Sequence, residues 1–199
     1  MILSILAASL PLFLFIFAGL FSPGPNVVML TTSGARFGFR ATLPHLLGVP
    51  IGTGLLAAAS VLGVQSILFA LPAIEFTIKF ISALWILWLS WKLINASRSK
   101  ARSRDRPFTF FQALLFQVVN PKVWAVALAA SAGFSIELNI WAEAARLFLG
   151  FSLINLFVCF FWTTAGHLLA GYLQRPVIWR IFMTVMAAMM ASSAALIFV

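Results

Sequence analysis

Six long apolar stretches, each about the length of a membrane span, constrain the fold of this 199-residue chain more than any other feature of its sequence. A helix needs about 20 predominantly apolar residues to cross a bilayer. Stretches of that kind run over Leu6–Thr31, Ala41–Gly63, Leu71–Trp91, Phe110–Gly133, Ala144–Gly171 and Val177–Phe198. The sequence therefore predicts an all-α integral membrane protein with six transmembrane helices.

The composition agrees with a lipid environment. Hydrophobic residues make up 63% of the chain and charged residues only 9%, whereas a soluble domain carries about a quarter charged residues. The formal net charge of +9 does not indicate nucleic-acid binding, because Lys and Arg lie in the breaks between apolar stretches, where they set membrane topology. The first stretch has no basic segment before it, so we interpret it as a retained helix and not a signal peptide.

The basic residues also predict the orientation. Three of the breaks, the first, third and fifth, hold ten of the thirteen Lys and Arg residues: Arg36, Arg40, Lys92, Arg98, Lys100, Arg102, Arg104, Arg106, Arg175 and Arg180. The opposite side has Lys79 and Arg146, and Lys122 lies inside a stretch. Basic loops remain on the cytoplasmic side. We therefore expect a multi-pass protein of the bacterial cytoplasmic (inner) membrane with both termini outside.

The chain divides into two similar halves within a single transmembrane domain, residues 1–199. Residues 1–92 and 109–199 each hold three stretches, and a basic cytoplasmic loop, residues 93–108, joins them. The first stretch of each half is interrupted, by Ser22 to Asn26 in one and by Asn120-Pro121 in the other. Interrupted segments at corresponding positions are typical of inverted-repeat transporters. We expect a 3+3 inverted repeat with broken helices 1 and 4.

The interruptions predict a binding site. Proline removes a backbone donor, and the groups freed in this way are tolerated at membrane depth only where protein or water satisfies them. The ends of broken helices offer N–H groups to a carboxylate and carbonyl groups to an ammonium. We expect both breaks to line one cavity, with Asn155 of the fifth stretch beside them. The residues of the two breaks are Pro23, Gly24, Pro25, Asn26, Asn120 and Pro121. Two purely structural kinks are the alternative.

Three further side chains are candidates. Lys122 falls at membrane depth, where a cation is costly when it faces lipid, so we assign it to a substrate carboxylate or to a cluster of carbonyl groups; a structural Lys is the alternative. His45 and His167 could relay a proton or be interfacial residues satisfied by their neighbours. Asn155 could line the pathway or hydrogen-bond across helices. The lone Cys159 indicates neither a disulfide nor a metal site.

At the breaks the sequence resembles the LysE/RhtB family of amino-acid exporters. The family signature of its first helix corresponds to Pro23-Gly24-Pro25-Asn26, and that of its fourth helix to Asn120-Pro121-Lys122. The run from Phe116 to Asn120 and the run from Ala165 to Leu168 look like the cysteine and O-acetylserine exporter branch. Thr53 stands where some members have Asp, which weakens an inference to a cationic substrate such as lysine.

The resemblance implies a secondary transporter that exports a neutral amino acid or amino-acid derivative by proton-coupled alternating access. It implies an amino-acid-like substrate and a proton as partners, with a homodimer left open. The composition adds membrane lipid, and the residues indicate no cofactor or metal. Transport of another small solute or of a metal ion, or a non-transporting role in a membrane assembly, are the alternatives. An intramembrane enzyme would need a nucleophile, paired acids or metal ligands at membrane depth, and the sequence offers no such cluster.

Overall fold

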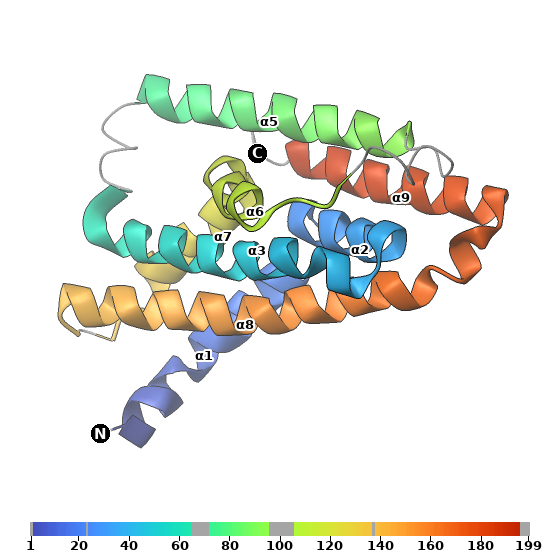
Figure 1. The fold of residues 1–199 in the computed structure, drawn as a ribbon. Coiled ribbons are helices and arrows are strands. Elements are labelled where there is room, and N and C mark those ends of the chain that lie inside the picture. Colours follow the sequence, from blue (N-terminus) through green and yellow to red (C-terminus); the bar gives the residue numbers. More distant parts are fainter. Residues whose placement is uncertain (1, 23, 65–71, 96–105, 137, 196–199) are drawn as a thin grey trace.

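The computed structural model describes residues 2–22, 24–64, 72–95, 106–136 and 138–195, and all regular secondary structure within them is helical. The first half contains α1 (Ile2–Phe21), α2 (Pro25–Phe37), α3 (Phe39–Ala59), the π-helical turn η1 (Ser60–Val64) and α5 (Pro72–Ile94) (Figure 1). The second half contains α6 (Phe110–Phe116), the 3₁₀ turn η3 (Gln117–Val119), α7 (Pro121–Gly133), α8 (Ile140–Leu169), the 3₁₀ turn η4 (Tyr172–Gln174) and α9 (Pro176–Ala195).

The predicted all-helical membrane fold is confirmed, and the described residues of the six apolar stretches are helical apart from the breaks. By length and composition, Phe39–Gly63 and Ile140–Leu169 can each cross a membrane alone. Two further spans arise when each bent pair is counted as one: α1 with α2, bent by 58°, and α6–η3 with α7, bent by 68°. The remaining stretches correspond to α5 and to the shorter apolar part of α9, Pro176–Ser192.

Helices that occupy the same place in the two halves contact each other. The long helices α3 and α8 lie side by side in opposite directions, and α5 lies along α9 (Figure 1). The first half's α1 contacts α7 of the second half, and α2 packs between α3, α8 and α9. The broken helices of both halves therefore lie against the same central pair, α3 and α8.

The outer surface of α3 is apolar and its inner face holds small and polar residues. Its exposed large hydrophobic side chains follow a four-residue spacing and are Leu43, Leu47, Ile51 and Leu55. The buried face includes Thr42, His45 and Thr53, whose exposed fractions are 3% or less. A water-soluble helix buries its apolar face, so this reversed arrangement indicates that α3 faces lipid.

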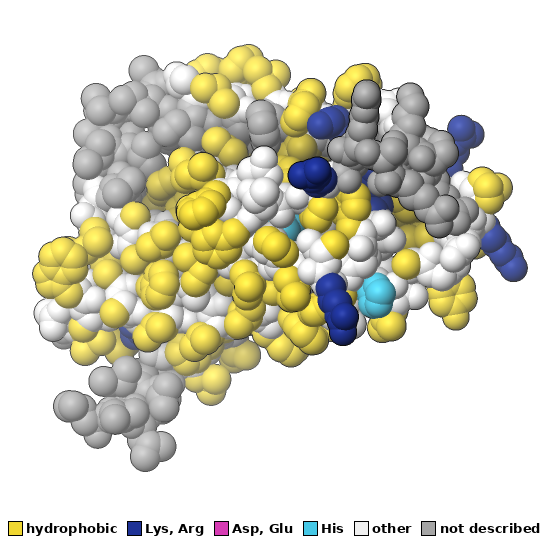
Figure 2. Space-filling view, viewed as in Figure 1, with side chains coloured by type: hydrophobic (Ala, Val, Ile, Leu, Met, Phe, Trp, Pro, Cys, Tyr) yellow, Lys and Arg dark blue, Asp and Glu magenta, His cyan; other side chains and the backbone are white. Residues whose placement is uncertain are grey.

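Charge is distributed unevenly over the surface. On the face shown in Figure 2, most of the visible Lys and Arg side chains lie in the half of the molecule that includes the end of α8 and the start of α9, and hydrophobic side chains cover much of the other half. Arg36 in the last turn of α2 and Lys92 in the last turn of α5 belong to this basic side of the sequence pattern.

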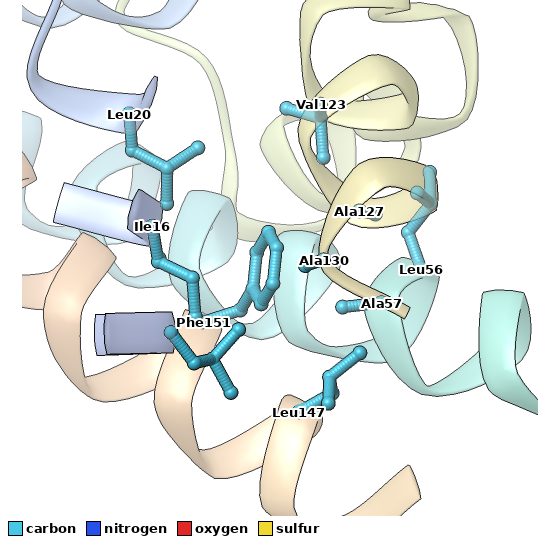
Figure 3. Packing of buried hydrophobic residues seen from close by; sticks show 10 residues of the cluster. Ile16, Leu20, Leu56, Ala57, Val123, Ala127, Ala130, Leu147 and Phe151 are labelled. Carbon is cyan, nitrogen blue, oxygen red and sulfur yellow. The ribbon is translucent and has the colours of Figure 1, made fainter. Parts of the chain in front are cut away.

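The largest apolar cluster in the described part of the chain joins α1, α3, α7 and α8 (Figure 3). Phe151 of α8 is fully buried in it, against residues that include Ile16, Leu20, Ala127 and Leu147. We call these packed side chains the apolar plug; its ten buried members are Leu12, Ile16, Leu20, Leu56, Ala57, Val123, Ala127, Ala130, Leu147 and Phe151.

Candidate functional site

Both helix breaks begin their second helix with proline, which needs no N–H partner at that position. Gly24 precedes Pro25 of α2, and Asn120 precedes Pro121 of α7; both preceding residues have extended backbones, the conformation favoured before proline. Neither residue caps its helix with a side-chain hydrogen bond. The N–H groups of a first helical turn have no intrahelical partner, so each break presents a positive helix end. Pro23 lies outside the described residues.

A cluster of three amide side chains connects the two breaks. Asn26 and Gln117 exchange two hydrogen bonds, from Asn26 Nδ2 to Gln117 Oε1 at 2.8 Å and from Gln117 Nε2 to Asn26 Oδ1 at 3.2 Å. Asn120 Nδ2 also donates to Gln117 Oε1, at 3.5 Å. The two asparagines that the sequence singles out thus share one partner, and the two breaks lie together.

Lys122 joins the breaks a second time. It lies in the first turn of α7, and its Nζ donates to the carbonyl oxygen of Ser22, just beyond the end of α1. Gly24 leaves room for this side chain, because a Cβ built there would lie 2.7 Å from Lys122 Cδ and 3.0 Å from Nζ. The ammonium group therefore stands beside the N-terminus of α2, where two positive ends and one cation lie close together.

A cavity lies at this junction. Its walls come from both breaks and from α8, and its lining residues are Leu20, Gly24, Asn26, Val27, Leu30, Asn120, Lys122, Val123, Asn155, Val158, Cys159 and Trp162. The empty space is about 330 Å³, counting the part that is open to the surroundings, and only a small fraction of it has room for a water molecule. Among the described residues, the lining contains one charged side chain, Lys122, and no carboxylate.

On α8, the polar part of the wall is held by hydrogen bonds. Asn155 Nδ2 donates to Thr53 Oγ1 of α3 at 3.0 Å, and Thr53 Oγ1 donates to the Pro50 carbonyl oxygen at 2.9 Å. Cys159 Sγ donates to Asn155 Oδ1 at 3.5 Å. Asn155 therefore lines the cavity and also bonds across helices. Its place on a transport pathway stays a prediction.

Close packing borders the cavity on both sides along α8. The apolar plug contacts α8 through Leu147 and Phe151, before the lining residues 155–162. Beyond them, α2 and α8 meet backbone to backbone: a Cβ on Gly34 would lie 2.3 Å from the Thr163 carbonyl oxygen, and one on Gly166 would lie 2.0 Å from that of Thr31. The cavity is thus bounded by apolar side chains at one end and by a glycine contact at the other.

The two histidines lie away from this cavity. His45 of α3 is buried, its ring packs 5.3 Å from that of Phe108, and its Nδ1 has no hydrogen-bond partner among the described residues. His167 is exposed in the last turn of α8, near Gly38. Neither side chain lines the cavity.

A buried ion pair lies at the opposite end of α8. Arg146 donates to Glu143 Oε2 through Nε at 2.9 Å and through Nη2 at 2.7 Å. Its guanidinium also donates to Ser9 Oγ of α1 at 3.2 Å and to the carbonyl oxygen of Phe134, beyond α7. Glu143 accepts from the N–H of Ile136 at 2.8 Å. This pair connects α1, the α7–α8 connection and α8.

Sequence reasoning missed two polar side chains at the site. Gln117 is fully buried and lies one helical turn before the second break. The sign of its role in the sequence is a polar amide residue within an apolar run. Trp162 lines the cavity, and its Nε1 is buried without a partner among the described residues. The spacing of tryptophans alone gives no sign of that role, because most tryptophans of membrane proteins are interfacial anchors.

Comparison with known proteins agrees with this architecture. The profile of the LysE type translocator family matches residues 17–199. A cysteine/O-acetylserine efflux protein of Salmonella choleraesuis (strain SC-B67) is 29% identical over 152 residues, which cover 74% of this chain and 76% of the relative. A protein of the same description from Escherichia coli O1:K1 / APEC is 26% identical over 151 residues, with the same coverage of each chain. No solved structure matches the chain.

Proposed function

Because the chain belongs to the LysE type translocator family, and is therefore a transporter and not an enzyme, we propose that it exports a small neutral amino acid from the bacterial cytoplasm. The observation that carries this proposal is the meeting of two helix breaks at one cavity, joined by Asn26, Gln117 and Asn120. An amino acid presents a carboxylate and an ammonium group a short distance apart. The cavity offers groups for both.

The carboxylate end of the substrate is assigned to Lys122 and the helix N-termini. Two helix N-termini each carry a partial positive charge and unpaired N–H groups, and Lys122 adds a full charge in the first turn of α7. The carbonyl oxygen of Ser22 holds its ammonium in the structure. A substrate carboxylate would compete with the Ser22 carbonyl oxygen for this ammonium. The ammonium would then donate to a charged acceptor in place of a neutral one.

The lining favours a neutral side chain on the substrate. A cationic side chain would need a carboxylate partner, and the described lining residues include none. The position at which some family members have Asp is Thr53, which is already bonded to Asn155. The relatives described as cysteine/O-acetylserine efflux proteins support a substrate of that size and charge.

Transport is proposed to proceed by alternating access of two inverted repeats, residues 1–92 and 109–199. The contacts between α3 and α8 and between α5 and α9 join helices at the same position in each half, as a two-fold axis in the membrane plane would. Separation of α2 from α8 at Gly34 and Gly166 would open the cavity to the cytoplasm. Loosening of the apolar plug would open it to the outside.

We further propose that export is coupled to the movement of protons. His45 is the stronger relay candidate, because its buried Nδ1 lacks a partner among the described residues, whereas His167 is exposed at the end of α8. In proteoliposomes, an imposed proton gradient should drive uphill transport by the wild type. The His45→Gln protein should retain substrate exchange but lose most of the gradient-driven accumulation, and equal accumulation by both proteins would remove His45 from the coupling.

Metal-ion transport finds less support. A metal path needs converging His, Cys, Asp or Glu side chains, and the described residues contain no group of three of them that could hold an ion.

The test is efflux from cells that express the protein. Cells preloaded with labelled cysteine, serine, lysine or glutamate are compared with cells that express Asn120→Leu to the same membrane level. We expect faster release of cysteine or serine from wild-type cells, and no effect on lysine or glutamate. Release of lysine alone, or equal release of cysteine and serine by both proteins, would contradict the proposal.

A further inference from the structure

We infer that Gln117 is a positioning residue for substrate recognition: it turns the Asn120 amide so that its oxygen faces the cavity and accepts the ammonium group of the substrate. This inference rests on the proposed function and concerns how the same cavity distinguishes the two ends of an amino acid. Gln117 itself is fully buried and is not among the lining residues, so it acts through its neighbours.

A backbone carbonyl group determines the orientation of the Gln117 side-chain amide. Gln117 Nε2 donates to the carbonyl oxygen of Ala113 at 2.8 Å, one turn earlier in α6. A carbonyl oxygen can only accept, so the opposite orientation of the Gln117 amide would place two acceptors against each other. The Ala113 carbonyl therefore fixes which side of the Gln117 amide carries oxygen.

The Gln117 amide in turn orients the side-chain amides of both asparagines through hydrogen bonds. Gln117 Oε1 accepts from Asn26 Nδ2 at 2.8 Å and from Asn120 Nδ2 at 3.5 Å, and Gln117 Nε2 donates a second time, to Asn26 Oδ1 at 3.2 Å. A primary amide has two N–H donors and two oxygen lone pairs. All four of these sites on Gln117 are used, so it has nothing left for a ligand and its own orientation is fully determined.

Asn120 is left with an oxygen that has no partner. Its nitrogen is directed at Gln117, so its Oδ1 points the other way, and this atom is buried without a hydrogen bond among the described residues. An asparagine before a helix ordinarily uses this oxygen to cap the first turn, but Asn120 makes no such bond to α7. Because Asn120 is 1% exposed and lines the cavity, a donor for this oxygen has to come from the cavity, and we assign that place to the substrate.

The chemistry of the ligand group follows. An oxygen acceptor binds a donor and repels a carboxylate, so Asn120 Oδ1 selects the ammonium end of an amino acid, which has three donors and a positive charge. Lys122, two residues further on, selects the carboxylate end. Reversal of the Asn120 amide would replace the acceptor by an N–H group and remove this distinction.

The experiment measures equilibrium binding to the purified full-length protein. The two probes are L-cysteine and 3-mercaptopropionate, kept reduced; the second lacks only the ammonium group. Wild-type protein should bind cysteine more tightly than 3-mercaptopropionate. Gln117→Leu should weaken cysteine binding about tenfold, the effect of one hydrogen bond to a charged group, and leave 3-mercaptopropionate binding nearly unchanged. Gln112→Leu, the same change at an exposed residue of α6 whose side chain caps the start of that helix, is the control for general weakening of α6 and should preserve the wild-type preference.

A second substitution that restores the preference for cysteine distinguishes a positioning role of Gln117 from a general effect on the structure. An aspartate has acceptor oxygens on both sides of its carboxylate, so Asn120→Asp added to Gln117→Leu should restore the preference for cysteine without any orienting partner. If Gln117→Leu is not recovered from membranes, Gln117→Met takes its place in both measurements. Equal weakening of both probes, or an unchanged preference, would overturn the inference. Failure of the wild type to bind cysteine at all would instead contradict the proposed function.

Discussion

Lys122 shows how a single polar group is kept in an apolar segment. Lys122 lies at the start of α7, and its ammonium donates to the carbonyl oxygen of Ser22, just beyond the end of α1. A lysine at membrane depth is costly unless such groups surround it. The same arrangement leaves the ammonium at the edge of the cavity, where a substrate carboxylate can exchange with the carbonyl oxygen.

We therefore expect Lys122→Ala to lower amino-acid export at least tenfold, because a charged hydrogen bond to the carboxylate is lost, while the protein still inserts. Lys122→Arg should recover only part of the activity, since its planar fork differs in shape from an ammonium. Initial efflux rates, normalised to the amount of protein in the membrane, provide the measurement. Export by Lys122→Ala at the wild-type rate would show that Lys122 only caps the Ser22 carbonyl.

The matched control is Lys92→Ala. Lys92 is an exposed lysine at the end of α5, where its Nζ lies 4.3 Å from the centre of the Trp88 ring. It is remote in the sequence from both breaks and does not line the cavity. Its replacement should leave the efflux rate within about twofold, as expected for a surface charge outside the site.

At the residue scale, the sequence predicted the groups at the breaks but not their partners. Asn26, Asn120 and Lys122 stand out because each is a polar residue beside a proline in an apolar run. Gln117 lies in the same run, but its bond to Asn26 joins residues 91 positions apart, and no local pattern reports such a contact. The same limit applies to Thr53, whose role depends on Asn155, 102 positions away.

At the element scale, a proline alone does not predict where a helix breaks; the conformation of the residue before it must be considered as well. Pro44 and Pro50 lie inside α3, which remains one helix, whereas Pro25 and Pro121 each begin a new helix after a bend. The difference lies in the preceding residue: Gly24 and Asn120 adopt extended backbones before proline. Helix positions were therefore predictable from hydropathy, but the bend angles of 58° and 68° were not.

The ion pair of α8 leads to a prediction at this scale. Arg146 and Glu143 are 9% and 5% exposed, and Arg146 also holds Ser9 of α1 and the Phe134 carbonyl. Removal of one member of a buried pair leaves an uncompensated charge and costs about 3–5 kcal/mol. We expect Arg146→Leu to lower the free energy of unfolding by that order, measured by thermal or denaturant unfolding in detergent.

The double variant is the control for this interpretation. Glu143→Leu with Arg146→Leu leaves no buried charge, so it should recover much of the stability that Arg146→Leu loses. Additive losses in the two single variants and the double variant would mean that the pair is not coupled in the folded protein.

At the scale of the whole molecule, the basic residues predict that both termini lie outside. Reporter fusions at Arg102, in the central loop, should report the cytoplasm, and fusions after Val199 should report the outside, because basic loops are retained in the cytoplasm. A fusion after Ile94, at the end of α5, provides a second cytoplasmic position. The same side for Arg102 and the C-terminus would exclude an odd number of spans in the second half, and with it the inverted repeat.

The most direct test of a substrate site between the two breaks uses Cys159, the single cysteine of the chain, which lines the cavity. Labelling of Cys159 by a small maleimide in membranes is timed with and without saturating serine, which has no thiol, and denatured protein gives the value for full labelling. Opening of the cavity during transport should allow labelling, and bound serine should slow it in a saturable way, more weakly in Asn120→Leu. Equal labelling rates with and without serine, in protein that exports serine, would contradict a substrate site between the breaks.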